Sequence, residues 1–376
     1  IIIKGFPPSE LKLIDLTIRM FTQPLIEVDD ALLLERLDEV KKEKEGLLSG
    51  LKNKLNCDSE EEVRKKLASN NQFADLLEEL GVQAPLKESP VTGKQTYALA
   101  KTDEGFIDLQ QHEDPFIQDL CAVRLGTKST IEESRIERFI GIGARNKGLL
   151  PIPLKYYGAH TGRWSGSDKV NFQNLPSRDA KKKALKQALI PPDDSVIMNV
   201  DSSQIEARVL VWLVGLGYGT GAMKLQNVLK LGGAELSETE CQRLVNLYRE
   251  LNDKVVQLWR DCDGALSDIA SWPKDKPEYY IGQKEAVLVT PEGLKLPNGL
   301  YIYYPELEWD TSELKGGYVY KSRRGKVGTW GGSIVENVVQ ALARIIIGEQ
   351  MVAISHKYRP VLTVHDAIVC VAGEEE

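Results

Sequence analysis

The sequence predicts an α+β protein in which helix-rich parts surround a small antiparallel sheet. Residues 30–82 carry leucines at helical spacing between charged residues, which is typical of long amphipathic helices. Residues 195–201 (SVIMNVD) and 361–371 (VLTVHDAIVCV) are rich in the β-branched residues that favour strands. Residues 333–354 form an apolar helical pattern. That helix must be mostly buried, so we expect it to lie in a core.

Four of the expected helices begin with a shared pattern, a Ser followed three residues later by a Glu. In such a capping box each side chain bonds a backbone N–H that the helix leaves free. The pairs are Ser59 with Glu62, Ser129 with Glu132, Ser237 with Glu240, and Ser333 with Glu336. A further helix is expected directly after the strand at 195–201, over SQIEARVLVWLVG.

The strand at 195–201 places Asp201 at its carboxyl end. Its side chains alternate between two faces, with residues 196, 198 and 200 on one and residues 197 and 199 on the other. The run 361–371 divides into two short strands with a bend at His365 and Asp366, since Asp tolerates turn geometry. Residues 294–304 predict another hairpin, in which Asn298 and Gly299 suit a type I′ turn.

Composition excludes several classes of protein. A chain of 376 residues allows two or three subdomains, and 27% charged with 42% hydrophobic residues is ordinary for a globular protein. We find neither a signal peptide nor an apolar run long enough to span a bilayer. The five cysteines form no C-x-x-C pair, and there are only four histidines. A disulfide framework or a zinc site is therefore not expected, whereas a reducing compartment is the expected environment.

The net charge of −7 argues mildly against a nucleic-acid partner, although local fields matter more than the total in a large enzyme. Basic runs lie at 181–186 (KKKALK) and 321–326 (KSRRGK). Such runs are more often solvated surface than binding sites. The segment SPVTGKQT suggests a P-loop, but Glu88 and Gln95 stand where that loop needs Gly and Ser or Thr.

Two aspartates suggest a metal site. If the strands that carry Asp201 and Asp366 are neighbours, two carboxylates meet at one edge of the sheet. Oxygen ligands without a His or Cys cluster suit Mg²⁺, and a two-metal site of this kind serves phosphoryl transfer. The pair alone is weak evidence, because a hairpin turn without any chemistry would also place an Asp at position 366.

The surrounding motifs occur in a fixed order. They are HTGRWSGSDKVNFQNLP at 160–176, DSSQIEARVL at 201–210, GYG at 217–219 and VHD at 364–366, with LIDLTIRMFTQP at 13–24 upstream. This order resembles the polymerase domain of family A DNA polymerases, the polymerase I type, and most closely the phage branch. The resemblance runs through almost the whole chain.

The resemblance implies a right-hand architecture. It assigns residues 1–26 to the palm entry, 27–150 to a helical thumb, 151–215 to the palm, 216–274 to the remaining fingers and 275–376 to the palm again. It further implies a DNA-directed DNA polymerase with two Mg²⁺ ions, for which Mn²⁺ could substitute. Its partners would be primer–template DNA and deoxynucleoside triphosphates, without a membrane. The expected location is the cytoplasm, that of the host cell if a phage encodes the chain.

The resemblance also assigns residues to the metals and the nucleotide. Asp201 and Asp366 match the metal-binding aspartates, with the backbone carbonyl of Ser202 as a further ligand. Gln204, Glu206 and Tyr218 match the nucleotide site. A carboxylate packed under the sugar, such as that of Glu206, leaves no room for a ribose 2′-hydroxyl. Without the family match, Glu206 would be a solvated helix residue and Tyr218 ordinary packing.

Six further residues match positions that contact DNA. Arg163 corresponds to an arginine that probes the primer terminus in the minor groove, where acceptors lie at similar places for every base pair. Gln340 corresponds to a glutamine that projects from a buried palm helix toward the DNA minor groove. The alternative role, a buried glutamine whose amide is satisfied within the protein, is equally compatible with the sequence. The others are Asn171, Gln173 and Asn174, whose alternative role is turn chemistry, and His365, expected near the primer-terminal phosphate.

The chain departs from the family pattern in three ways. Asp201 and Tyr218 are only 17 positions apart, so a segment with the Arg and Lys that hold the triphosphate is deleted or lies outside this sequence. Ala367 replaces a frequent Glu after V-H-D, which is expected to alter metal dependence. The final palm segment and a proofreading exonuclease are not expected here. Two alternatives stay open, a catalytically silent primer–template-binding module and a related single-subunit RNA polymerase, against which Glu206 argues.

Overall fold

The computed structural model describes residues 6–88, 93–168, 171–176, 183–213, 222–231, 236–311, 316–323 and 325–374. The chain divides into two compact units. Unit 1 contains residues 1–26, 151–174 and 191–376, and unit 2 contains residues 27–150 and 175–190. Unit 2 is therefore inserted into the chain of unit 1.

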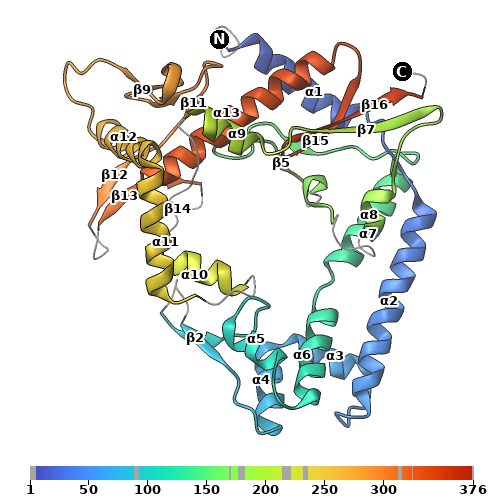
Figure 1. Cartoon of the computed structure of the whole chain (residues 1–376). Helices are drawn as coiled ribbons and strands as arrows, with labels where there is room; N and C mark the ends of the chain where they lie inside the picture. The colour runs from blue at the N-terminus through green and yellow to red at the C-terminus, as the bar shows by residue number, and fades with distance from the viewer. Residues whose placement is uncertain are drawn as a thin grey trace. The chain divides into compact units, whose positions relative to one another are not determined.

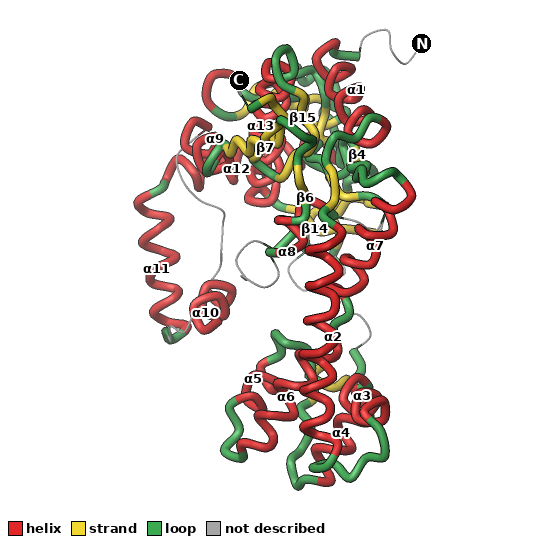
Figure 2. The backbone as a smooth tube through the Cα atoms, turned by 90° about the vertical axis from the view of Figure 1, so that its right-hand side faces the viewer, coloured by secondary structure: helices red, strands yellow, loops and turns green. Residues whose placement is uncertain are grey.

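Unit 2 is mainly helical. Figure 2 shows α3, α4, α5 and α6 gathered around the C-terminal part of the long helix α2. Their apolar side chains form one core around Phe73, Phe106 and Ile117, all of which are fully buried. The elements are β1 (Glu27–Val28), α2 (Asp30–Lys52), α3 (Glu60–Ala68), α4 (Asn70–Glu79), β2 (Leu86–Glu88), β3 (Gln95–Tyr97), α5 (Glu104–Gln110), α6 (Pro115–Lys128), α7 (Ile131–Arg145), α8 (Ala184–Gln187) and β6 (Leu189–Ile190).

Unit 1 combines helices with antiparallel sheets, ordered β15-β16-β7, β11-β10-β9-β8 and β12-β13-β14, and the pair β4-β5 (Figure 1). This confirms the predicted α+β class, although the described residues form several antiparallel sheets where a single small one was predicted. The helical elements are α1 (Pro8–Thr22), η1 (Phe172–Asn174), α9 (Ile205–Leu213), α10 (Ala222–Leu231), α11 (Glu238–Leu251), α12 (Asp253–Ala270), η2 (Gln283–Glu285) and α13 (Gly331–Ile354). The strands are β4 (Leu154–Lys155), β5 (Ser165–Gly166), β7 (Ser195–Asp201), β8 (Tyr279–Ile281), β9 (Val287–Thr290), β10 (Gly293–Lys295), β11 (Tyr301–Ile302), β12 (Glu308–Asp310), β13 (Gly317–Ser322), β14 (Gly325–Thr329), β15 (Arg359–Val364) and β16 (Ala367–Gly373).

Strands β15 and β16 form the predicted hairpin. Val364 pairs with Ala367, so His365 and Asp366 alone make the turn, and His365 adopts φ of 51°. Strand β16 also pairs with β7 along its whole length, from Ala367 opposite Asp201 to Gly373 opposite Ser195. The sheet thereby joins the two segments that the sequence analysis singled out.

Helix α13 is the central helix of unit 1. Its buried residues pack with α9, α12 and strands β8 to β11 in one hydrophobic core. By length and composition α13 could span a membrane, so the expectation that no segment is apolar enough was wrong. Because 56% of its apolar window is buried inside the protein, α13 has the environment of a core helix. One such helix is weak evidence for a membrane span.

Two of the four capping predictions were wrong. Helix α7 has Thr130 as N-cap without a side-chain bond, and the Glu132 carboxylate, which was predicted to reach back to Ser129, accepts from Arg36 Nε at 3.0 Å. Helix α13 begins at Gly331, whose N–H donates to Asp263 Oδ1 of α12 at 2.5 Å. The acceptor for the first N–H of α13 is thus a side chain of another helix. The spacing of neighbouring residues in the sequence does not reveal such a partner.

The other two helix starts agree with the prediction. Ser237 and Glu240 form a complete capping box. Ser59 caps α3 through the Glu62 N–H, while the Glu62 carboxylate accepts from Asp58 N–H rather than from that of Ser59. The helix start at Ser59 is therefore confirmed, and the reciprocal half of its box lies one residue earlier.

The turn between β10 and β11 is not type I′. Gly299 N–H donates to the Leu296 carbonyl at 2.9 Å, so Pro297 and Asn298 are the central residues. Gly299 follows them with φ of 82°, whereas Asn298 is not among the residues with positive φ. A proline locked at negative φ suits the first central position of an ordinary turn, and it shifts the turn by one residue.

Candidate functional site

The two aspartates lie at the same end of one sheet. Asp201 ends β7, and Asp366 precedes β16, its antiparallel neighbour. The Ser202 N–H donates to the Asp366 carbonyl at 2.9 Å, which continues the strand pairing one residue past Asp201. The backbone therefore fixes both residues relative to each other, as the prediction of neighbouring strands required.

At this end of the sheet the negative charges of Asp201 and Asp366 lie close enough to affect each other. Burial raises the pKa of Asp366 above its ordinary value, and the nearby charge of Asp201 raises it further, while His365 and Arg163 partly offset this. Ser203 Oγ donates to Asp201 Oδ2 at 3.1 Å. A cation between the two carboxylates would relieve their repulsion.

The donor set fits a hard divalent cation. Within the described part of the chain, no group of three or more His, Cys, Asp and Glu side chains could hold a metal. Mg²⁺ needs no such cage, because it is usually bound by one or two carboxylates together with water and substrate phosphates. The Ser202 carbonyl accepts from Ile205 N–H at 3.0 Å, and a carbonyl retains a second lone pair for a ligand.

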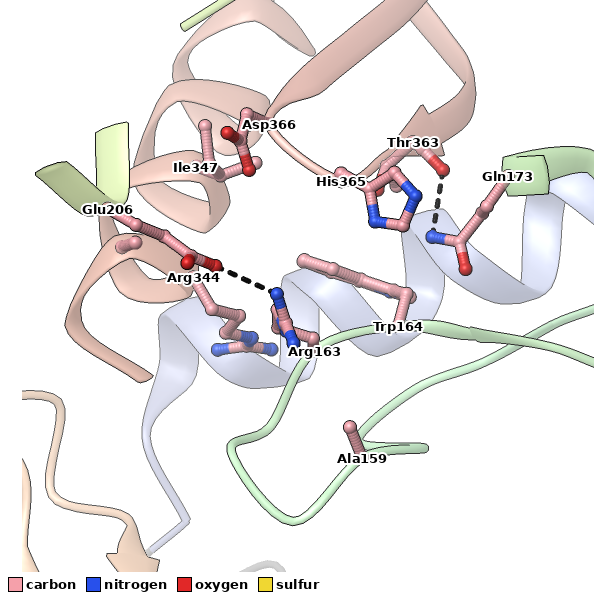
Figure 3. A pocket seen from close by; sticks show the side chains of 11 residues that line it. Ala159, Arg163, Trp164, Gln173, Glu206, Arg344, Ile347, Thr363, His365 and Asp366 are labelled. Carbon is pink, nitrogen blue, oxygen red and sulfur yellow. Dashed lines mark hydrogen bonds and ion pairs between the residues drawn. The ribbon is translucent and has the colours of Figure 1, made fainter. Parts of the chain in front are cut away.

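Arg163 lies at the centre of a polar network, and Figure 3 shows it bonded to Glu206, with Asp366 among the residues around them. Its Nη1 donates to Glu206 Oε1 at 2.8 Å, and its Nη2 donates to Gln340 Oε1 at 2.8 Å. Thr161 Oγ1 lies 3.4 Å from the same oxygen of Gln340, whose Nε2 donates to Glu336 at 3.1 Å. The guanidinium is thus held by α9 on one side and by α13 on the other.

Several neighbouring groups shift the pKa of Glu206 in opposite directions. Burial raises its pKa, Arg163 lowers it, and the charges of Asp366 and Glu336 raise it, with a net shift above the ordinary value. Its side chain is 28% exposed, and that of Arg163 is 34% exposed. Both groups therefore remain accessible while they pair with each other.

The polar run at 171–174 is partly committed to turn chemistry, as the alternative interpretation proposed. Asn171 Oδ1 accepts from Gln173 N–H at 3.0 Å, and Asn174 N–H donates to the Asn171 carbonyl at 3.2 Å. Gln173 Nε2 donates to the Thr363 carbonyl at 3.1 Å, so η1 is attached to β15 (Figure 3). The run is therefore anchored to the sheet that carries Asp366.

The remaining predicted residues differ in their placement. His365 and Gln204 are exposed, and each adopts a left-handed backbone conformation, with φ of 51° and 55°. Both thus lie at turns beside the two aspartates. Tyr218 falls outside the described residues. The fingers assignment at 216–274 is likewise only partly within them.

A cavity of about 120 Å³ lies beside Asp366. Figure 3 shows side chains from the loop around Arg163, from α9, α13 and the β15–β16 turn around it. Its lining includes Arg163, Trp164, Glu206, Arg344, His365 and Asp366. The residues that sequence reasoning selected in three separate motifs are therefore brought to one place.

Sequence reasoning missed Arg344 and Trp164. Arg344 is 4% exposed, and its Nη1 donates to Glu10 Oε1 of α1 at 2.5 Å. Two signals were available: an arginine within an apolar helix, which needs an acidic partner, and its position one turn after Gln340. The partner itself could not be found from spacing, because it lies 334 positions away.

Comparison with known proteins agrees with this arrangement. Residues 34–216 match the model of DNA polymerase family A. This match covers just under half of the chain. A DNA polymerase of Bacillus phage SP02 is 27% identical over 304 residues, which take up 57% of this chain and 46% of the phage protein. The chain thus spans about half the length of that relative. Since 57% of the 376 residues is about 214, roughly 90 of the 304 aligned positions are ones at which the phage protein carries a residue and this chain has none.

Other relatives match shorter parts. The thermostable DNA polymerase I of Thermus aquaticus is 28% identical over 140 residues, 37% of this chain and 16% of that protein. Among solved structures, the POL domain of Pol1 from M. smegmatis, in complex with DNA primer-template and dNTP, has a TM-score of 0.67 at 19% identity. It covers 97% of this chain and 64% of that chain, and at this identity it shows the fold alone.

Proposed function

We propose that this chain is the polymerase domain of a family A, DNA-templated DNA polymerase, which adds deoxynucleotides to a primer 3′-hydroxyl. The observation that carries the proposal is the pairing of β7 with β16, which brings Asp201 and Asp366 to one end of a sheet beside Arg163 and Glu206. In the reaction the 3′-oxygen bonds to the α-phosphorus of the nucleotide, and pyrophosphate leaves.

Asp201, Asp366 and the Ser202 carbonyl would hold two Mg²⁺ ions, with Mn²⁺ as a substitute. Bound there, the ions supply charge stabilisation for the attacking and leaving oxygens of an in-line phosphoryl transfer. The raised pKa of Asp366 supports this role, since two close carboxylates gain most from a cation. Ala367 leaves no third carboxylate at this turn.

The neighbouring residues would bind the primer and the sugar. Arg163 presents a planar donor that suits the minor-groove acceptors shared by all base pairs, so it would probe the shape of the terminal pair without reading sequence. Glu206 would occupy the space that a ribose 2′-hydroxyl needs. Gln340 would support Arg163, and His365, Asn171, Gln173 and Asn174 would contact the primer and template backbones. Gln204 and Tyr218 are assigned to the nucleotide.

The architecture is proposed on the same basis. Unit 2 would be the thumb, unit 1 the palm with the remaining fingers, and primer–template DNA and deoxynucleoside triphosphates the partners. The family match, the phage relative and the polymerase fold of the M. smegmatis structure support it. The location would be the cytoplasm.

Extension of a labelled primer on a DNA template, with Mg²⁺ and four deoxynucleotides, tests the proposal. Stepwise extension is expected from the wild type. Asp201→Asn and Asp366→Asn should each abolish it, because an amide holds a cation poorly, while primer–template affinity stays within about threefold. Asp193→Asn is the matched control, since it removes a carboxylate just before the opposite end of β7.

The outcomes separate the alternatives. Tight DNA binding without extension by the wild type would identify a silent primer–template-binding module. Preferential use of ribonucleotides would identify a single-subunit RNA polymerase. Equal losses of binding and extension in Asp201→Asn would contradict its role as a metal ligand.

A further inference from the structure

Two residues of α13 hold two consecutive residues of the loop before β5. Gln340 Oε1 accepts from Arg163 Nη2 at 2.8 Å, and one turn later the Arg344 guanidinium lies over the Trp164 ring at 4.7 Å. The spacing of four places both side chains on one face of the helix. Arg163 and its neighbour are therefore attached to the same rigid element.

The charge of Arg344 is already balanced. Arg344 and Glu10 form an ion pair in which the side chains are 2% and 3% exposed. Asn298 Nδ2 donates to Glu10 Oε1 at 2.7 Å, and the Tyr156 hydroxyl donates to Glu10 Oε2. The pair uses Nη1 alone, since Nε and Nη2 of Arg344 are buried without a hydrogen-bond partner in the described part of the chain. What the rest of the guanidinium contacts is therefore decided by the loop beside it.

Arg344 contacts the loop through aromatic rings. Besides Trp164, its guanidinium lies over the rings of Tyr156 at 5.3 Å and Tyr157 at 5.5 Å. These three aromatic residues belong to the segment that leads into and follows Arg163. A flat guanidinium stacks on such rings, whereas the compact ammonium of lysine keeps the charge but loses the plane.

Trp164 is itself fixed. It is 6% exposed, and its Nε1 donates to Thr17 Oγ1 of α1 at 2.9 Å. Gly162, with φ of 78°, lies so close to Tyr157 that a Cβ there would be 2.7 Å from the ring. A side chain at position 162 would clash with that ring, and Trp164 anchors the residue after Arg163 to α1, while the side chain of Arg163 itself stays partly exposed.

We propose that Arg344 is a positioning residue, which acts through Trp164 to hold Arg163 in the orientation that meets the primer-terminal base pair. This inference rests on the proposed function, because it assumes that Arg163 contacts the primer terminus. It adds a specificity role for a residue that does not itself touch DNA or nucleotide.

Equilibrium binding of primer–template duplexes to the full chain tests this without catalysis. One primer ends in guanine and the other in 3-deazaguanine, which lacks the minor-groove N3 acceptor. Because a hydrogen bond to a charged donor contributes roughly tenfold in affinity, wild type should prefer guanine by about that factor. Arg163→Ala should abolish the preference. Arg344→Lys should lose most of it, and adding Arg344→Lys to Arg163→Ala should change the preference no further.

Arg359→Lys is the matched control. Arg359 also connects β15 to the C-terminal end of α1, through the Gln23 carbonyl, but it lies outside the loop and the cavity. It should keep the wild-type preference. If Arg344→Lys unfolds at the assay temperature, Trp164→Leu replaces it, since that change removes the stack and leaves the Arg344–Glu10 pair.

The outcomes are distinguishable from a failure of the proposed function. A guanine preference that depends on Arg344, in a chain that does not extend primers, would support positioning and contradict polymerase activity. A preference retained in Arg344→Lys but lost in Arg163→Ala would overturn the positioning role. So would an equal loss of affinity for both primers in Arg344→Lys, which indicates a structural role only. No preference, or no DNA binding, in wild type would overturn it as well.

Discussion

Arg163 and Glu206 form an ion pair beside the two aspartates, with 2.8 Å between Nη1 of the arginine and Oε1 of the glutamate. In the proposed function the first residue contacts the primer end and the second limits the incoming sugar. The pair therefore couples two specificity functions, and each residue restrains the other when no substrate is bound.

Glu206→Ala is expected to weaken sugar discrimination. Removal of the carboxylate opens the space for a 2′-hydroxyl and frees one nitrogen of Arg163. We expect ribonucleotide use relative to deoxynucleotide use to rise on the order of a hundredfold, since excluding a group sterically is worth about 1–3 kcal/mol. Competition between the two nucleotides during primer extension measures it. Glu349→Ala, on the exposed side of α13, is the control, and an unchanged ratio in Glu206→Ala would disprove the gate.

Divalent cations should stabilise the protein in a pH-dependent manner. The folded pKa of Asp366 is raised, so the ionised group costs stability once the pH exceeds the ordinary carboxyl value, and the whole cost is present above the raised value. Mg²⁺ should therefore raise the melting temperature at pH 7 and lose this effect as Asp366 becomes protonated. Thermal melts with and without Mg²⁺ across pH 3 to 8 test this. Asp366→Asn should largely lack the Mg²⁺ effect, and a full effect in that variant would contradict the assignment.

Glu10→Ala should strongly destabilise unit 1. It leaves the Arg344 charge buried without its partner, which typically costs about 3–5 kcal/mol. Burial raises the pKa of Glu10, but Arg344, Tyr156 and Asn298 outweigh this and bring it below its ordinary value. The wild-type contribution is thus complete above the ordinary carboxyl pKa and is lost as the pH falls through the lowered value.

Urea unfolding at pH 7 and at lower pH checks this prediction. Glu308→Ala, an exposed carboxylate paired with Lys326, should change stability by less than about 1 kcal/mol. A similarly small effect in Glu10→Ala would show that the buried pair contributes little.

Arg124→Met should destabilise unit 2 and leave the site chemistry unchanged. Arg124 is 1% exposed, donates to the carbonyls of Leu67 and Ser69, and lies 4.4 Å from the Phe73 ring centre. Methionine leaves those buried acceptors unsatisfied, at a cost of about 1–3 kcal/mol. Urea unfolding measures it, with the partly exposed Arg64→Met on α3 as control. Equal stability of both variants would contradict the role of Arg124.

Local patterns predicted the elements of the candidate site better than they predicted its supporting contacts. The alternation over 195–201 and the bend at His365 and Asp366 were visible because strand period and turn chemistry are properties of neighbouring residues. The start of α13 was misplaced because its acceptor, Asp263, comes from α12. The Arg344–Glu10 pair could not be predicted either, because its two residues come from distant parts of the sequence. Only the folded chain brings such residues together.

Unit 1 is built from three separate stretches of chain, which constrains the order in which the protein can form during synthesis. Glu10 leaves the ribosome long before Arg344, and β7 before β16, so the core of unit 1 must wait for the last part of the chain. The helices around α2 need only residues 27–150 for their core, so they can fold early, as domains do during translation. A ribosome that stalls near residue 300 would therefore expose an ordered helical unit together with an unfinished unit 1.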